Sequence, residues 1–272
     1  MRFRQLFVAG AVVAATVAFM SPAEATHSWG GYHWARTSNP FTLKLGDNVT
    51  SAWASYLGVA STDWSQSAVL QTTVQPGSTN ARLCKGKSGT VQVCNAAYGS
   101  TGWLGIASIS ITGGTHITQG TVKLNDTYFN TASYNTPAWR SLVTCQEIGH
   151  TFGLNHQDET FSNANLGTCM DYTNYPSGDP KIPGDLSNEH PNTHDYDQLV
   201  SIYNHADSST TVAASTAASA SPSGQVQVDR GPAGAPGEWG RLVSGSESPR
   251  HVAIYERDFG GGDKEVTFVT WA

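Results

Sequence analysis

The segment from Gln146 to His156 constrains the fold of this chain more than any other part of its sequence. It reads Gln-Glu-Ile-Gly-His-Thr-Phe-Gly-Leu-Asn-His. On a helix, Glu147 and His150 are three residues apart and therefore lie on one face. Gly153 can adopt a positive φ and end the helix, which lets the chain turn back and bring His156 towards His150. The segment therefore predicts two imidazoles and a carboxylate close to one point.

Two imidazoles beside a carboxylate have the chemistry that a catalytic zinc ion requires, because the nitrogen atoms hold the ion and the carboxylate acts as a base towards water. A lone His–Glu pair on a helix is more often a solvated face, but here the pattern continues through Gly153 to His156. Further along, the stretch Gly167-Thr168-Cys169-Met170-Asp171-Tyr172 places a methionine in a predicted turn. We therefore expect a metal centre rather than a solvated helix face.

The segment resembles the long zinc motif of the metzincin metalloproteases, which reads H-E-x-x-H-x-x-G-x-x-H and is followed by a Met-turn. Within that group it is most similar to the matrixin-type branch, whose members commonly have Gly directly before the second His, as Gly149 stands here. The resemblance covers residues 26–206. It implies an α+β fold, a metzincin-like zincin domain with a twisted mixed sheet, a zinc helix, the Met-turn and a C-terminal helix.

The resemblance also implies roles for individual residues. Glu147 would be the general base, His150 and His156 would bind Zn²⁺, and Met170 would form a hydrophobic floor beneath the ion. A wall of the substrate pocket would be formed by Tyr172, Tyr175 and Pro176. The implied activity is that of a zinc-dependent endopeptidase, which hydrolyses peptide bonds in a protein or peptide substrate.

The sequence departs from the family motif at the first ligand position, where Gln146 replaces His. A neutral amide oxygen is a poorer zinc ligand than imidazole, so either the affinity falls or the coordination changes. Gln146 could bind zinc through its side-chain oxygen, or another group could complete the site: Asp158, His190 or His194. In a third alternative the protein is a catalytically silent binding protein that keeps the fold and has lost or weakened its zinc site. We expect the metal-dependent enzyme.

The first 25 residues predict a signal peptide. Two arginines precede an apolar stretch from Leu6 to Met20, and Ala23 and Ala25 stand at the positions that a signal peptidase reads. We therefore expect residues 1–25 to be removed and the protein to be secreted to the extracellular space. No other apolar run approaches the roughly 18 residues that a membrane span needs.

The charge balance argues against one class of partner. The chain has 15 Lys+Arg and 21 Asp+Glu, a net charge of −6, whereas a nucleic-acid-binding protein needs a basic surface to displace counterions. Ten of the acidic residues fall between residues 147 and 207, with Lys181 as the one basic residue there. This surplus indicates a solvated loop, or calcium ions that fix the loop, so Ca²⁺ is a second candidate cofactor. We expect a monomer that binds neither nucleic acid nor membrane.

Four cysteines in a secreted chain predict disulfide bonds. Cys84 and Cys94 flank a predicted hairpin turn, so a bridge between them is the simplest pairing, and it leaves Cys145 with Cys169. The second bridge would join the zinc helix to the Met-turn. The sequence alone admits three pairings of four cysteines.

Apolar periodicity predicts strands in the first half of the chain and helices later, which is typical of an α+β domain. The predicted strands are Phe41–Leu45, Val69–Val74, Thr90–Val93, Leu104–Ile111 and Val122–Asn125, and the predicted helices are Ala52–Val59, Ala138–Gly149 and Thr193–His205. We expect a substrate to add as a further strand along Val122–Asn125, at the edge of the sheet.

The composition changes near Asp207. Residues 207–230 are rich in Ser, Ala and Thr and predict a flexible linker. Residues 231–272 then contain two strand-like runs joined by Gly260-Gly261-Gly262-Asp263, which indicates a β-hairpin. About 40 residues are few for an independent domain, so this extension of unknown role is either marginally stable alone or docked on the main body. Residues 26–41 leave no room for a folded pro-domain, so an active enzyme would need another form of control.

Overall fold

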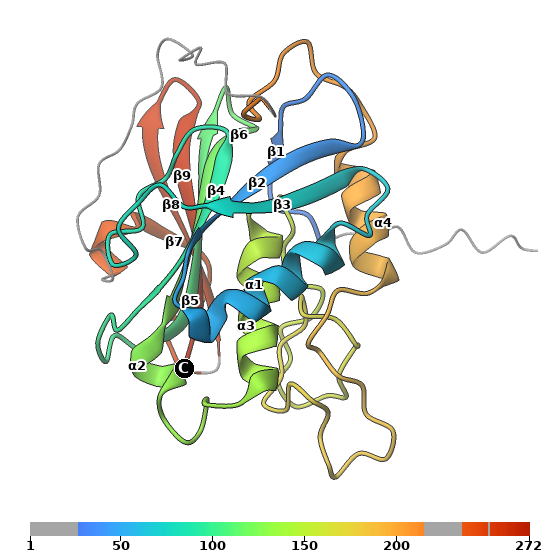
Figure 1. The fold of residues 1–272 in the computed structure, drawn as a ribbon, viewed down its shortest axis with the longest axis vertical. Helices are drawn as coiled ribbons and strands as arrows, with labels where there is room; N and C mark the ends of the chain where they lie inside the picture. The colour runs from blue at the N-terminus through green and yellow to red at the C-terminus, as the bar shows by residue number, and fades with distance from the viewer. Residues whose placement is uncertain (1–26, 215–235, 250) are drawn as a thin grey trace, which may run out of the picture.

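The computed structural model describes residues 27–214, 236–249 and 251–272, in which a mixed nine-stranded sheet packs against helices (Figure 1). This is the α+β architecture that the sequence predicts. The predicted signal peptide, residues 1–25, lies outside the described residues, and so do residues 215–230 of the predicted linker. Within the described ranges, no helix has both the length and the apolar character that crossing a membrane requires.

The elements follow the predicted order. The helices are α1 (Ser51–Trp64), α2 (Asp126–Phe129), α3 (Pro137–His150) and α4 (Thr193–Ile202), with a 3₁₀ turn at Pro236–Glu238. The strands are β1 (His33–Trp34), β2 (Phe41–Asn48), β3 (Leu70–Pro76), β4 (Thr90–Ala96), β5 (Trp103–Thr112), β6 (His116–Asn125), β7 (Arg241–Gly245), β8 (Val252–Gly260) and β9 (Asp263–Trp271).

The sheet has a parallel half and an antiparallel half. Its strand order is β3-β2-β4-β6-β5-β9-β8-β7, and β1 pairs with β6 outside this path. The pairs among β3, β2, β4 and β6 are parallel, whereas every pair from β6–β5 onwards is antiparallel. The direction therefore changes at β5, a strand that contacts α3.

The helices α1 and α3 contact each other and lie against the sheet (Figure 1). α1 buries Trp53, Leu57 and Trp64, which recur at helical spacing. α3 begins at Pro137, a residue that suits the first helical position, and the Thr136 side chain caps it by accepting a hydrogen bond from a backbone N–H of the first turn. The amphipathic face of α1 thus supports α3 from the side.

α3 is buried from Leu142 to its last residue. Two buried indoles donate hydrogen bonds to backbone carbonyls of α3 and its C-cap. Trp64 Nε1 donates to Cys145 O at 3.1 Å, and Trp34 Nε1 donates to Thr151 O at 2.9 Å. These bonds come from α1 and β1, so two separate elements fix the orientation of the helix that carries the predicted site.

Two helices differ in length from the prediction. α1 continues beyond Val59 to Trp64, because the polar run at 61–63 is followed by an indole that completes the buried face. α4 ends at Ile202, three residues before the predicted end. The next residue, Tyr203, is fully buried, and its hydroxyl donates to Phe152 O at 3.0 Å, so it packs into the body instead of extending the helix.

The expectation that Val122–Asn125 forms the sheet edge is wrong. These residues belong to β6, which pairs with β4 on one side and β5 on the other. β6 is an interior strand because two neighbours of opposite direction flank it. No substrate strand can add there.

The C-terminal extension docks on the main body. β9 pairs with β5 along Trp103–Ile111, and β8 and β7 continue the same sheet (Figure 1). Apolar side chains of β8 and β9, including Ile254 and Phe268, belong to the same core as α3. The beginning of the predicted linker is also attached, since the backbone N–H groups of Thr211 and Ala213 donate to carbonyls of the body.

Both predicted disulfides are present, Cys84–Cys94 and Cys145–Cys169. The second one links α3 to the segment that carries Met170. Of the three pairings that four cysteines admit, the local one is therefore confirmed.

Candidate active site

α3 and the turn that follows it bring together four side chains, which we call the α3 site: Gln146, Glu147, His150 and His156. Gly153 adopts a φ of 91°, in the left-handed region. A Cβ at this glycine would lie 2.1 Å from Tyr32 O, so no larger residue fits. The turn at Gly153 is what lets the chain return to the helix and place His156 beside His150.

The two histidines meet at their Nε2 atoms, which lie 2.9 Å apart. The Nδ1 of His150 lies 2.9 Å from Leu154 O, and because a carbonyl only accepts, Nδ1 carries the proton and Nε2 presents its lone pair. The Nδ1 of His156 faces a carboxylate oxygen of Glu159 at 3.6 Å, which favours the same tautomer. Burial lowers the pKa of His150 well below its usual range, and burial also lowers the pKa of His156. Both rings are therefore in the neutral form that binds metals.

The Glu147 carboxylate is fully buried one turn before His150. Its Oε1 accepts a hydrogen bond from Thr270 Oγ1 at 2.6 Å, and its Oε2 has no hydrogen-bond partner. Burial raises the pKa of this carboxyl to about 8, and the bond from Thr270 offsets part of the rise. A carboxyl group that titrates near neutral pH can both take up and return a proton.

Gln146, the residue that replaces the first histidine of the motif, is anchored at both ends of its amide. Nε2 donates to Cys169 O at 2.9 Å, and Oε1 lies 3.1 Å from Thr270 Oγ1, whose single proton it shares with the closer Glu147 Oε1. The same hydroxyl bonds Glu147, so the amide oxygen and the carboxylate lie on the same side of the helix. The oxygen, and not the nitrogen, is the end of Gln146 that faces the site.

Met170 packs beneath α3. A Cβ added to Gly149 would lie 2.7 Å from Met170 Sδ and 2.7 Å from the ring of Trp64. Gly149 is thus the residue that lets the methionine and the indole approach the helix. The backbone N–H of Gln157 donates to Met170 O at 2.6 Å, which ties the Met-turn to the residue after His156.

Of the three predicted wall residues, Tyr172 lies against the site. Its ring is 4.5 Å from that of His156, and its hydroxyl is 3.4 Å from Thr270 Oγ1. Burial raises the pKa of this hydroxyl well above its usual range, so it remains a neutral donor. Tyr175 is exposed and Pro176 is buried further along the loop.

The alternative ligands are not brought to the histidines. Asp158 accepts from the backbone N–H of Thr160 at 3.0 Å, His190 pairs with Asp63 at 2.7 Å, and the ring of His194 stacks on another histidine. Among the residues that the structure describes, no group of three metal-ligating His, Cys, Asp or Glu side chains includes any residue of the loop 155–192. Carboxylates of this loop accept hydrogen bonds from its own backbone, as Asp171 does from Leu166 N and Asp185 from Asn165 N.

The C-terminal strand covers the α3 site, a feature that the sequence analysis missed. The ring of Phe268 stacks face to face on that of His150, with centroids 4.2 Å apart and planes 7° apart. Two residues on, Thr270 bonds Glu147 and Gln146. The exposed fractions of Glu147 and His150 are both 0%. The groups that would carry the chemistry are thus closed off by the chain itself.

The sequence held a signal that β9 is an interior strand, although not for its place beside β5. Both faces of Lys264–Trp271 carry large apolar or aromatic side chains, whereas an isolated hairpin has one wet face. Val266 and Phe268 join the core around α3, and Val269 and Trp271 join a second cluster on the other face of the sheet. The pattern indicates an interior strand of a covered sheet.

A zinc ion fits the residues of the α3 site. Two lone pairs at 2.9 Å repel each other unless a proton or a cation lies between them. The Nδ1 of His150 has a carbonyl acceptor, as in metal-bound histidines, and the Nδ1 of His156 faces the Glu159 carboxylate at the longer distance of 3.6 Å. The unpartnered Oε2 of Glu147 is the kind of buried polar atom that requires an explanation. Zinc is the metal that this donor set of imidazole nitrogens with oxygen favours.

Comparison with known proteins gives only distant similarity. No protein-family model matches the chain, and no curated protein matches it. Among solved structures it is similar to high choriolytic enzyme 1, a hatching enzyme zinc-protease from the medaka fish Oryzias latipes, with a TM-score of 0.37 and 11% identity over 66% of this chain and 98% of that one. It is also similar to myroilysin, with a TM-score of 0.34 and 12% identity over 63% of this chain and 96% of that one. Similarity at this level assigns no activity to the chain.

Proposed function

We propose that this chain is a secreted, zinc-dependent endopeptidase with Glu147 as its general base. The observation that carries the proposal is the pair of neutral imidazoles, His150 and His156, whose Nε2 atoms face each other at 2.9 Å on the helix that presents the buried Glu147. The long motif shared with the metzincin metalloproteases supports the same reading. Secretion follows from the predicted signal peptide and agrees with the two disulfides.

His150, His156 and the amide oxygen of Gln146 would hold the ion. When bound, zinc supplies Lewis-acid polarisation of a carbonyl and acidifies water. Glu147 takes the proton from the attacking water on its free Oε2 and returns it to the leaving amine, for which a carboxyl with a raised pKa is suited. Met170 supports the helix from below, and Tyr172 with Tyr175 and Pro176 bounds the pocket.

The substrate is a peptide or protein chain in extended form. β5 passes directly beside the catalytic carboxylate, because a Cβ on Gly105 would lie 2.6 Å from Glu147 Oε1. A peptide that adds to β5 as an antiparallel strand would therefore place its backbone over the α3 site. The position that it needs is the one that β9 occupies.

A catalytically silent binding protein is the second candidate. One observation favours it: the Gln146 amide is held at both ends, by Cys169 O and by the hydroxyl of Thr270, so a metal ion on its oxygen would compete with the contact to Thr270. In that case the cleft would bind a peptide or glycan without cleaving it.

The test uses an opened variant, Phe268→Ala with Thr270→Ala, which removes the ring over His150 and the hydroxyl on Glu147 but keeps the full chain. We expect one zinc ion bound by His150 and His156 and hydrolysis of casein. Adding Glu147→Gln to the opened variant should lower the rate by about 10²–10⁴-fold while zinc stays bound. If the opened variant binds no zinc at these histidines and cleaves nothing, the binding protein is the correct alternative.

A further inference from the structure

Four further metal-ligating side chains meet at the end of the sheet where β1 pairs with β6, and we call them the His33 cluster: His33, His116, His205 and Asp207. They come from three segments, β1, the first residue of β6 and the chain after α4. Nε2 atoms of His33, His116 and His205 lie 3.5, 3.3 and 3.7 Å from Asp207 Oδ1. The Nε2 atoms of His33 and His205 are 3.2 Å apart. None of these residues belongs to the α3 motif.

The four separations given above are close to the edges of a metal coordination tetrahedron, and the ligand atoms of His33, His116 and Asp207 all lie within 4.8 Å of one another. A tetrahedral zinc ion with bonds of about 2.0–2.1 Å holds its ligand atoms about 3.3–3.4 Å apart. The contacts to Asp207 Oδ1, at 3.3–3.7 Å, are by contrast long for hydrogen bonds. The ring of His33 is perpendicular to those of His116 and His205, at 84° and 87°, which lets nitrogens from different directions face one centre.

The hydrogen bonds around the His33 cluster leave lone pairs facing inward. His33 Nδ1 lies 2.8 Å from Gly31 O, so the proton is on Nδ1 and the lone pair of Nε2 faces the carboxylate. The other oxygen of Asp207 accepts from Arg36, from Nη1 at 2.6 Å and from the backbone N–H at 3.1 Å. Arg36 thus fixes the carboxylate and leaves Oδ1 free to bind a cation. Such outer partners are typical of metal sites.

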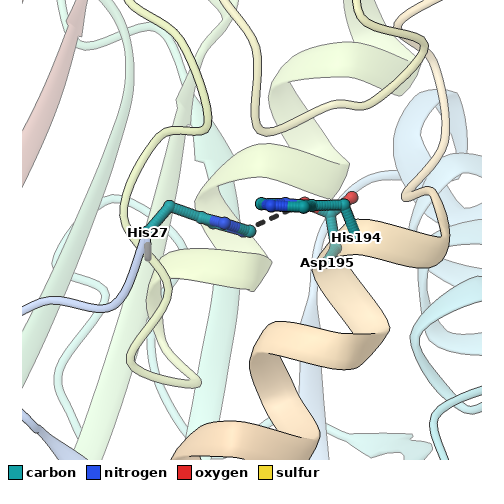
Figure 2. Close-up of side chains that lie close together, drawn as sticks. All are labelled: His27, His194 and Asp195. Atoms are coloured by element: carbon teal, nitrogen blue, oxygen red, sulfur yellow. Dashed lines mark ion pairs between the residues drawn. The ribbon is translucent and has the colours of Figure 1, made fainter. Parts of the chain in front are cut away.

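A second group of histidines, His27 and His194 with Asp195, also brings metal-ligating atoms within 4.8 Å of one another. Figure 2 shows His27 and His194 with their rings stacked, and the planes are 15° apart with centroids at 4.8 Å. The lone pair of an imidazole lies in the plane of its ring, so two nearly parallel rings are less suited to hold one ion than the perpendicular rings of the His33 cluster. His27 Nε2 lies 3.1 Å from Asp195 Oδ1 (Figure 2), but neither of these atoms, nor the Nδ1 atom of either ring, has a hydrogen-bond partner.

We propose that the His33 cluster binds a structural divalent metal ion of the zinc class, separate from the α3 site. His33, His116 and Asp207 would supply three ligands, and His205 would supply the fourth and close the coordination as in structural rather than catalytic zinc. The ion would fasten the chain after α4 to β1 and β6. Because β1 supplies the indole of Trp34 that binds the end of α3, the metal also supports the helix of the α3 site.

The test begins from a full-length variant without the α3 ligands, His150→Asn with His156→Asn. After removal of metal with a chelator, titration with Zn²⁺ should give one ion bound per chain, and Co²⁺ should give the intense visible bands of tetrahedral coordination. Adding His205→Asn, an exposed change, should reduce the stoichiometry to none and abolish the rise in melting temperature on zinc addition. His116→Asn should do the same.

The matched control is His190→Asn, which removes an exposed histidine that pairs with Asp63 outside the cluster. It should leave one bound ion. The proposal is overturned if the parent variant binds no ion, or if the ion survives both His205→Asn and His116→Asn.

The position of β9 carries a second inference, which rests on the proposed function. The register pairs Thr270 with Gly105 and Phe268 with Ala107, so β9 runs antiparallel along the edge of β5 that faces the α3 site. Its last residues, with Leu104 and Tyr172, line an apolar cavity beside Gln146. We infer that β9 is an intramolecular inhibitor that occupies the position of a substrate strand.

Casein hydrolysis by the unmodified chain and by the opened variant tests this inference. The opened variant should be at least about 10-fold more active, and hydrogen exchange at the amides of β9 should be faster in it. The control Phe259→Ala removes a partly exposed ring from the same hairpin, away from the site, and should behave as the unmodified chain does. Equal activity of the unmodified and opened chains, with loss of activity in Glu147→Gln, would refute the inhibitor and leave the peptidase standing. If both chains bind zinc and neither hydrolyses casein, the proposed function fails and the inhibitor with it.

Discussion

The α3 site and the His33 cluster both gather imidazole nitrogens, but they complete their surroundings in different ways. The α3 site has two histidines on one helix and its turn, a glutamine amide and a buried carboxylate with a free oxygen. The His33 cluster has three histidines and an aspartate from three segments, and the second oxygen of that aspartate is already bound by Arg36. The first site offers two histidines and an amide, whereas the second offers three metal-ligating side chains within 4.8 Å of one another, with His205 beside them.

This difference indicates which of the two sites can catalyse a reaction. A catalytic metal keeps a coordination position for substrate or water, whereas a structural metal is closed by protein ligands. In the α3 site the remaining space is taken by Thr270 and Phe268 of the chain's own β9, which can be displaced. In the His33 cluster the remaining coordination positions would be filled by side chains that the fold holds in place. We therefore expect no catalytic turnover at that cluster.

The largest expected effect on the difference between the two sites is that of Gln146→His in the opened variant. It adds a third imidazole to the α3 site, and zinc affinity there should rise by about 100-fold or more, since changes in outer partners alone reach about 10–100-fold. Competition with a chromophoric chelator measures it. Affinity at the His33 cluster should not change, and an unaltered α3 affinity would show that residue 146 does not occupy a ligand position.

The outer partners of the two sites should differ in importance. Arg36 is buried and contacts Asp207 at 2.6 Å, whereas Glu159 is half-exposed and lies 3.6 Å from His156. We expect Arg36→Gln to weaken metal binding at the His33 cluster by about 10–100-fold. Glu159→Gln should weaken binding at the α3 site by less than 10-fold, because solvent screens the longer contact. Zinc titration of each variant tests this. A larger loss of affinity in Glu159→Gln than in Arg36→Gln would contradict the assignment of Arg36 as the partner that fixes the Asp207 carboxylate.

Gly105→Ala tests how closely β5 approaches the α3 site. The added methyl would lie 2.6 Å from Glu147 Oε1 and 2.7 Å from Val143 Cγ1, so we expect a loss of about 1–3 kcal/mol in the free energy of unfolding. Urea denaturation measures it. The matched control is Gly58→Ala in α1, where a Cβ meets nothing within 4 Å, and it should instead stabilise the chain by about 0.5–1 kcal/mol. A neutral Gly105→Ala would mean that β5 and the carboxylate are not in contact.

Local patterns were enough to predict one of these regions and not the other. The α3 site is encoded in consecutive residues, because helical spacing places Glu147 beside His150 and Gly153 sets the turn to His156. The ligands of the His33 cluster stand far apart in the sequence and show no motif spacing. They meet only because β1 pairs with β6 and the chain after α4 packs against both. A single sequence contains no local signal that these residues contact one another in the fold.

The same limit explains the error at the sheet edge. Val122–Asn125 and Lys264–Trp271 both read as strands, but strand order depends on pairing between distant segments, which apolar alternation does not specify. The hairpin at 260–263 was predictable from its glycines, whereas its place beside β5 was not. As a result the helix and ligands of the α3 site could be predicted, and its cover could not.

The smallest expected effect concerns the loop under the α3 site, which responds to pH through Asp171. Burial raises the pKa of this carboxyl to about 6, while the bonds from Leu166 N and Asn188 oppose the rise. Between about pH 4 and pH 6 the folded chain therefore holds a proton that the unfolded chain has released, so this group lowers the free energy of unfolding as the pH increases through that window. Asp171→Asn keeps an oxygen for Leu166 N and removes the titration.

Urea unfolding of metal-free protein at pH 4, 5, 6 and 7 measures the consequence. The stability of the unmodified chain relative to Asp171→Asn should fall by about 1–2 kcal/mol from pH 4 to pH 6 and stay constant above, with solvent screening included. Asp197→Asn, an exposed change on α4, should show no such slope. A stability difference that does not vary with pH would mean that the Met-turn loop is open to water, and the α3 site would then lack the rigid support that distinguishes it from a solvated histidine pair.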